Sequence, residues 1–206
     1  RMCWLLSEGE HICDIAVLGD DDRLPWDAAR ILFETQHDFT YINRTTLLEN
    51  AEITPKGVAI GNSFFSLLIV DGETFWNEEL GRKLSVLVDS GRVVAYGKKD
   101  FNPPLSKTAH NAGTLEKLVA ELTCPDVRLH PKNPGLRYIH IRHELRDFYI
   151  FANEAAESIA GELCVAAETD DREWWDPETG KVVSKSVDKL ILAPYQMLVL
   201  ACARKR

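Results

Sequence analysis

Two groups of acidic residues stand where the chain leaves a predicted strand. Asp71 ends the apolar run 65–70, and three consecutive aspartates follow the apolar run 11–18, namely Asp20, Asp21 and Asp22. An open α/β sheet binds its ligands beyond the carboxyl ends of its strands, so both groups are candidate ligand-binding residues. Clustered carboxylates of this kind can hold Mg²⁺, and a strand-end aspartate can accept a phosphoryl group.

This arrangement makes a phosphoacceptor receiver domain one alternative. Lys98, after the run 92–97, would complete the set with Asp71. A receiver domain also expects a short hydroxyl side chain at the end of the strand before its lysine, and residues 93–96 (Val-Val-Ala-Tyr) have none. Aspartates in loops commonly serve only to form turns. The receiver domain therefore stays an alternative and not the main hypothesis.

Trp174 and Trp175 form a second candidate ligand-binding site. Exposed aromatic rings can stack on sugar rings, which makes a carbohydrate-binding module centred on these residues another alternative. The two residues are adjacent on a predicted strand, so their side chains point to opposite faces and at least one ring is expected in the core. Packing in the core or at a domain interface is the favoured interpretation.

The residues of other familiar active sites are missing from the sequence. There is no Gly-x-Ser-x-Gly elbow, no cysteine at the end of a strand in the first half, and no glycine-rich phosphate loop. His140 and His143 lie three apart on a predicted strand and face opposite sides, so we interpret both as strand-surface residues and not as metal ligands. The sequence predicts no catalytic residue, no metal site and no cofactor.

The first 124 residues alternate between strand-like and helix-like segments. This alternation predicts βαβ units, and hence α/β architecture with an open, mostly parallel sheet of the flavodoxin type and helices on both faces. A hairpin is expected over 52–61, and Asn43 or Thr45 is expected to cap a short helix. The predicted strands are 11–18, 39–42, 65–70 and 92–97, and the predicted helices are 25–34, 80–88 and 115–122.

The pattern changes at Cys124-Pro125. The segment 128–135 is polar and contains two prolines, as a domain boundary does, and the period beyond it becomes two. This predicts a small antiparallel β-sandwich after the α/β domain, with the domains spanning 1–124 and 125–206. Its expected strands are 137–143, 148–153, 161–166, 190–192 and 197–202, with a tight turn over 176–181.

Composition limits the partners. The chain has 206 residues, 45% hydrophobic and 27% charged, which is usual for a globular protein. The net charge of −8 argues against nucleic acid, and no apolar run approaches the ~20 residues of a membrane-spanning helix. The five scattered cysteines are interpreted as small hydrophobes, with Cys13, Cys164 and Cys202 inside apolar runs. Unpaired cysteines and the lack of a signal-peptide pattern favour the cytoplasm, although the compartment stays open.

The start of the chain resembles the last turns of a helix that ends at Gly9. We therefore expect a segment cut out of a longer chain. Such an excision predicts an exposed apolar patch near Met2, Trp4 and Leu5, which could make the piece associate into a homo-oligomer.

Two segments resemble parts of large bacterial glycoside hydrolases. Residues 5–18, in which a helix ends at Gly9 and Asp14-Ile15-Ala16-Val17-Leu18 begins a strand, are similar to the junction between a catalytic barrel and a glutamine-amidotransferase-like domain. Residues 175–181 (Trp-Asp-Pro-Glu-Thr-Gly-Lys) and 147–154 look like a hairpin and its preceding strand in the accessory β domain of α-L-rhamnosidase-type enzymes. Gly19-Asp20-Asp21 departs from that pattern, where an aromatic residue and a proline are usual, so a β-galactosidase-like parent stays open.

The resemblance implies an accessory role. The catalytic carboxylates of such enzymes lie in the barrel, which would precede this segment, and the amidotransferase nucleophile has no counterpart here. The main hypothesis is a non-catalytic structural and interaction module whose partners are the missing barrel of the same chain and a second copy. The receiver domain and the carbohydrate-binding module are the alternatives.

Overall fold

The computed structural model describes residues 2–20, 23–72, 76–97, 101, 104–105, 107–184 and 188–204. The chain divides into two compact units, each described separately below. One unit comprises Cys13–Leu32 and Phe39–Cys124. The other combines residues up to Ile12, the segment Phe33–Asp38 and the chain from Pro125 onward. The units are therefore discontinuous in sequence, which differs from the consecutive domains 1–124 and 125–206 expected above.

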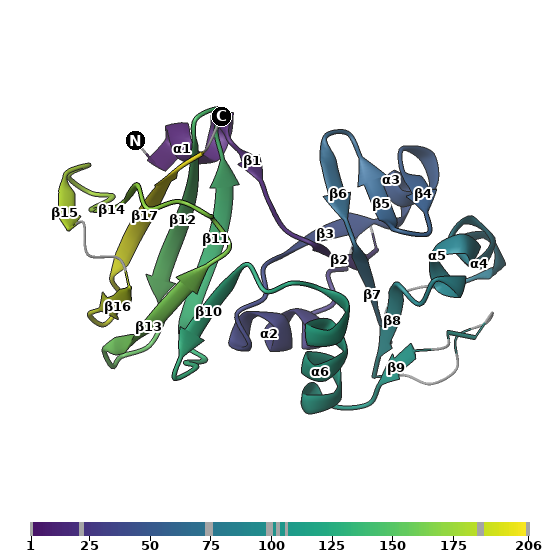
Figure 1. The fold of residues 1–206 in the computed structure, drawn as a ribbon. Coiled ribbons are helices and arrows are strands. Elements are labelled where there is room, and N and C mark those ends of the chain that lie inside the picture. Colours follow the sequence, from purple (N-terminus) through teal and green to yellow (C-terminus); the bar gives the residue numbers. More distant parts are fainter. Residues whose placement is uncertain are drawn as a thin grey trace. The chain divides into compact units, whose positions relative to one another are not determined.

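The first unit is built on a five-stranded parallel sheet (Figure 1). Its order is β3-β2-β7-β8-β9, which is 2-1-3-4-5 when only the strands of this sheet are counted. β2 and β7 are buried along their whole length, because they lie inside the sheet and read as unbroken apolar runs. The strands are β2 (Ile15–Gly19), β3 (Phe39–Asn43), β7 (Leu67–Asp71), β8 (Val93–Tyr96) and β9 (Lys107–Ala109).

Short helices accompany this sheet. Asn43 caps α3 through its side chain, which accepts the Thr46 N–H at 2.8 Å, as one of the two expected caps. The helical stripe expected over 80–88 is broken at Leu84 into two short helices. The helices are α2 (Asp27–Glu34), α3 (Arg44–Glu49), α4 (Glu78–Lys83), α5 (Ser85–Asp89) and α6 (Ala112–Leu122).

The expected hairpin over 52–61 is present and gains a third strand. β4 (Glu52–Thr54), β5 (Gly57–Ile60) and β6 (Ser63–Phe65) form a small antiparallel sheet. β9 was not anticipated, because three residues beside a proline-containing segment carry too little pattern to identify a strand.

The second unit contains two antiparallel sheets. The larger one has the order β1-β11-β12-β17-β14-β15 and the smaller one β10-β13-β16. Tyr149 and Leu200 of the larger sheet share a buried core with Leu163 and Leu190 of the smaller one, as in a β-sandwich. The strands are β1 (Glu10–His11), β10 (Val127–His130), β11 (Leu136–Arg142), β12 (Arg146–Asn153), β13 (Ile159–Val165), β14 (Arg172–Trp175), β15 (Val182–Ser184), β16 (Lys189–Leu192) and β17 (Met197–Ala203).

The other face of the larger sheet packs against helix α1 (Met2–Glu8). Leu5 of α1 is buried there against Ile141 and Phe148. Helix α1 ends just before Gly9, as expected. The exposed patch predicted around Met2, Trp4 and Leu5 is present only in part, because Trp4 is exposed but Leu5 is buried.

The expectation of one strand over 11–18 was wrong. Glu10 pairs with Arg142 and His11 with Ile141, which makes β1 an edge strand of the antiparallel sheet. Ile15 instead pairs in parallel with Phe39 and Leu67. The sequence does not reveal the break between β1 and β2, because both are strands within one mostly apolar run. Only their long-range pairing assigns them to different sheets.

Candidate functional site

Asp71 occupies the carboxyl end of β7, where an open α/β sheet is expected to bind a ligand. Its side chain is buried, with 4% of its surface exposed. Oδ2 accepts a hydrogen bond from the backbone N–H of Ala28 at 3.1 Å, in the first turn of α2. The first N–H groups of a helix lack partners within the helix, so Asp71 satisfies one of them from another element.

Two tyrosines lie close enough to Asp71 to feel its charge. Burial raises the pKa of Tyr41, and the charge of Asp71 raises it further. Burial also raises the pKa of Tyr96, followed by the charges of Asp27 and Asp71. The Tyr41 hydroxyl donates to the Pro25 carbonyl at 2.7 Å. These phenols stay protonated near neutral pH, so they can donate hydrogen bonds but cannot serve as bases.

The remaining acidic candidates are less closely defined. Asp20 lies in a loop, where its N–H donates to the Arg23 carbonyl at 2.9 Å. Asp21, Asp22 and Lys98 lie outside the described residues. In the part of the chain that the structure describes, no three histidine, cysteine, aspartate or glutamate side chains are grouped to hold a metal ion.

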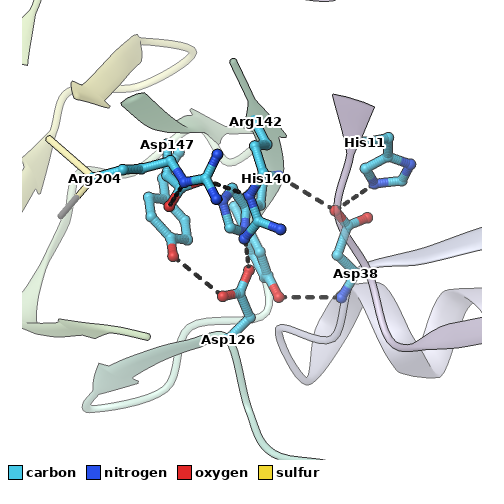
Figure 2. Close-up of polar contacts among 9 residues, drawn as sticks. His11, Asp38, Asp126, His140, Arg142, Asp147 and Arg204 are labelled. Atoms are coloured by element: carbon cyan, nitrogen blue, oxygen red, sulfur yellow. Dashed lines mark hydrogen bonds and ion pairs between the residues drawn. The ribbon is translucent and has the colours of Figure 1, made fainter. Parts of the chain in front are cut away.

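A buried ionic cluster centred on His140 lies in the β unit (Figure 2). His140 is 3% exposed. Its Nδ1 is 3.0 Å from Asp126 Oδ2, and its Nε2 is 3.2 Å from Asp147 Oδ1, without the alignment of a hydrogen bond. The His140 ring stacks on Tyr149 at 4.2 Å between centroids. The Tyr149 hydroxyl donates to Asp126 Oδ1 at 3.2 Å.

The charges of this cluster stabilise one another. Burial alone would lower the pKa of His140, but the hydrogen bond to Asp126, the close contact with Asp147 and the charges of both carboxylates overcome it, and the pKa is raised. Burial opposes ionisation of Asp147 as well, yet His140 and Arg142 hold the pKa of that carboxyl below its usual value. Arg142 Nε donates to Asp147 Oδ1 at 2.9 Å. The two carboxylates therefore favour the protonated form of His140.

The same cluster joins separate segments of the chain. Asp38 Oδ2 accepts from the His140 backbone N–H at 3.4 Å and lies 2.7 Å from His11 Nε2. The Asp38 N–H donates to the Tyr138 hydroxyl at 3.3 Å. Figure 2 shows Asp38 between His11 and the strand that carries His140. These bonds attach both β1 and the segment Phe33–Asp38 to the antiparallel sheet.

The surface interpretation of His140 was wrong, and the sequence contained a signal against it. Leu136, Tyr138 and His140 alternate along one strand, so His140 shares the face of two core residues. His143 does lie on the opposite side, where it stacks on Trp4 at 4.3 Å. Because His140 is sealed from solvent, its arrangement with two carboxylates serves structure and offers no site for a substrate.

The two tryptophans separate as expected. Trp174 is 3% exposed and packs against Phe151 in the core between the sheets. Trp175 points to the other face, beside Phe148. The Trp175 Nε1–H donates to Glu173 Oε1 at 2.9 Å, and the Arg146 guanidinium lies 5.6 Å from the ring centroid. Trp174 thus has no free face for a sugar, and Trp175 is largely engaged by its neighbours.

The cysteines also differ in part from expectation. All five are free thiols. Cys202 is buried, but Cys164 is exposed, because it alternates outward on β13, and Cys13 is half-buried. Cys13 lies just before β2, at the amino end of that strand, which is the wrong end of the sheet for a nucleophile elbow.

No protein-family model and no curated protein matches the sequence. Solved structures do match the fold. A rhamnosidase from Novosphingobium sp. PP1Y is similar with a TM-score of 0.69 and 16% identity, over 98% of this chain and 23% of that chain. A β-galactosidase from Bacillus circulans sp. alkalophilus has a TM-score of 0.61 and 10% identity, over 95% of this chain and 42% of that chain. Gan42B, a GH42 β-galactosidase, has a TM-score of 0.59 and 11% identity, over 94% of this chain and 40% of that chain.

These similarities define the fold. Both units of this chain together have the fold of a segment found in rhamnosidase and β-galactosidase chains, a glycoside-hydrolase-like fold. The chain spans less than half the length of each of these proteins. In the described residues, no helix is long and apolar enough to cross a membrane.

Proposed function

We propose that this chain is a non-catalytic accessory part of a larger glycoside hydrolase, which supports a catalytic barrel or contacts between subunits. The observation that carries the proposal is the burial of Asp71 beneath the first turn of α2. The position at which an open α/β sheet binds its ligands is thus occupied by a structural hydrogen bond. The match to nearly all of this chain, but under half of each similar hydrolase, supports the same reading.

The α/β unit is further proposed to be amidotransferase-like without amidotransferase chemistry. Its parallel strand order, 2-1-3-4-5, is the flavodoxin-like order. A glutaminase needs a cysteine nucleophile after a strand. The strands described here end instead at Gly19, Asn43, Asp71 and Tyr96, with β9 ending at Ala109.

The receiver alternative is weaker on this geometry. A phosphoacceptor carboxylate must reach both Mg²⁺ and a phosphodonor, whereas Asp71 is 4% exposed and bonded to Ala28. Incubation of the chain with acetyl phosphate and Mg²⁺, followed by mass spectrometry, tests it directly. Stoichiometric phosphorylation of Asp71 would overturn the accessory role in favour of signalling.

The decisive experiment reads the natural open reading frame that contains residues 1–206. We expect a preceding region of roughly 250 residues or more, the size of a (β/α)₈ barrel, with paired carboxylates at its strand ends. A reading frame without such a region would refute the proposal. In parallel, the isolated chain is assayed with p-nitrophenyl α-L-rhamnoside and p-nitrophenyl β-D-galactoside, and release of nitrophenol by the chain alone would also contradict it.

A further inference from the structure

A groove of about 630 Å³ lies within the β unit, beside the turn that joins β11 to β12. Helix α1 contributes Trp4 and Glu8 to it, and β1 contributes Glu10. Its volume is within the range of sites that bind small molecules. The accessory role proposed above does not use this groove, which shares Arg142 and Arg204 with the contacts around Asp147 of the His140 cluster.

Trp4 provides a flat, fixed surface in the groove. It is 45% exposed. One side of the indole stacks on His143, with centroids 4.3 Å apart and an interplanar angle of 25°. Phe148 meets it edge-on at 6.1 Å. The indole is therefore held by two rings while a large part of its surface stays open to solvent, so little freedom is lost when a ligand stacks on it.

The close approach of α1 to the sheet fixes the position of Trp4. His143 Nε2 lies 3.2 Å from the Leu5 carbonyl. Gly9 allows this approach, because a Cβ at that position would collide with Ile141 Cγ2 and lie 2.7 Å from His143 Nε2. The Trp4 indole, which we call the platform, thus keeps its position only because a glycine directly follows helix α1.

Polar groups of both signs surround the platform. The side chains of Glu8, Glu10 and Glu144 line the groove, and none has a hydrogen bond or ion pair with another described residue. Three arginines also line the groove, namely Arg142, Arg146 and Arg204. Each arginine also contacts a carboxylate. Arg142 lies 2.9 Å from Asp147, Arg146 lies 2.9 Å from Glu173, and Arg204 lies 3.9 Å from Asp147. A guanidinium has five N–H donors, so donors remain for a ligand.

We propose that this groove binds the pyranose ring of a neutral carbohydrate. A pyranose has an apolar C–H face that suits an indole, and hydroxyl groups that both donate and accept hydrogen bonds. The free carboxylates accept from those hydroxyls and the guanidinium groups donate to them. The three arginines already contact Asp147 and Glu173, so the three lining glutamates leave an excess of negative charge, which favours a neutral sugar over a uronic acid. This inference goes beyond the accessory role, since it needs no barrel.

Affinity electrophoresis tests the proposal on the intact chain. Native gels contain soluble galactan, a rhamnose-rich polysaccharide or polygalacturonate, and gels without polysaccharide serve as the reference. We expect one of the two neutral polymers to retard the chain, and Trp4→Ala to weaken the apparent affinity about tenfold or more. Trp26→Ala is the matched control, because Trp26 is exposed but belongs to the α/β unit. It should bind as the unmodified chain does.

A second measurement uses the unmodified chain, so its result does not depend on whether a variant folds. The indole N–H resonances of the unmodified chain are followed by NMR during titration with D-galactose, L-rhamnose and their oligosaccharides. The Trp4 resonance should shift, whereas those of Trp174 and Trp175 should not. Trp4→Phe, which keeps a ring against His143, should bind with intermediate affinity.

Several results would overturn the proposal. These are no retardation by any neutral polysaccharide, binding of polygalacturonate only, a shift of Trp175 in place of Trp4, or burial of Trp4 in a dimer by sedimentation and NMR. Because the reading-frame test measures a different property, a failure here leaves the accessory role intact, and the reverse also holds.

Discussion

Asp71 accepts the backbone N–H of Ala28 at 3.1 Å, although the two residues are 43 positions apart. The bond joins the end of β7 to the start of α2. Asp71 lies at the strand end where a ligand would be expected, but this bond makes it a structural residue of the α/β unit.

Replacement of Asp71 by alanine should destabilise the chain by about 1–3 kcal/mol, because the buried Ala28 N–H loses its acceptor. Asp71→Asn keeps an oxygen acceptor and should lose clearly less. Urea unfolding followed by circular dichroism measures both changes. Asp89→Ala is the control, since Asp89 is exposed, and it should change the free energy of unfolding by less than about 0.5 kcal/mol. Equal stability of Asp71→Ala and the unmodified chain would contradict the structural role.

The His140 cluster should make stability depend on pH. The pKa of His140 is raised above its ordinary value of 6.5, so the stabilisation from its protonated form is complete below that pH. It is lost as the pH rises through the folded pKa. The pKa of Asp147 is lowered from 3.8, so its contribution is present above 3.8 and is lost as the pH falls through the lowered value.

His140→Gln removes the titrating group and tests this assignment. Near pH 6 the variant should be less stable by about 1–3 kcal/mol, because the half-buried Asp126 and the buried Asp147 lose contact with His140, while Asp147 keeps its ion pair with Arg142. The difference from the unmodified chain should shrink as the pH rises above 6.5 and passes through the raised pKa of the folded state. Urea unfolding at several pH values gives the curve, with His110→Gln as the control, since His110 is exposed. A difference that does not vary with pH would show that folding leaves the pKa of His140 unchanged, which would contradict this assignment.

Gly9→Ala should loosen the packing of α1 on the sheet. The added Cβ would collide with Ile141 Cγ2 and crowd the Leu5 carbonyl at 2.8 Å, at a cost of about 1–3 kcal/mol. Hydrogen exchange of the α1 amides should become faster, while the exchange rates of the β12 amides should not change. Gly113→Ala in α6 is the matched control, because its Cβ would meet nothing closer than 3.7 Å. That variant should be neutral or slightly more stable. Unchanged protection of α1 in Gly9→Ala would refute the close packing.

Four of the five thiols should fall into two groups in their reaction with iodoacetamide near pH 8. Cys3, Cys124 and Cys164 are exposed and should be alkylated quickly. Cys202 is buried, and burial raises its pKa to about 11, so it should stay unmodified until the chain unfolds. Mass spectrometry of peptides from native and urea-treated chain measures this. Rapid alkylation of Cys202 in the native chain would contradict the packing of β17 in the core.

Local patterns determined much of this protein. Alternating strand-like and helix-like runs predicted the parallel α/β part, and the change to a period of two after Pro125 predicted the antiparallel sheets. The resemblance to glycoside hydrolase segments agrees with the fold of the similar solved structures. These features are visible in the sequence because periodicity and turn residues act over a few neighbouring positions.

Only the tertiary structure decided which segments belong together. The run 11–18 is divided between two sheets because His11 pairs with Ile141 whereas Ile15 pairs with Phe39 and Leu67, and no local pattern identifies partners so distant. His140 is an ordinary strand residue by sequence. It becomes a buried group whose protonated form is favoured, because Asp126 and Asp147 converge on it from other elements. The charge state of a buried group depends on the charged and hydrogen-bonding partners around it. These partners come from distant parts of the sequence, so only the tertiary structure identifies them.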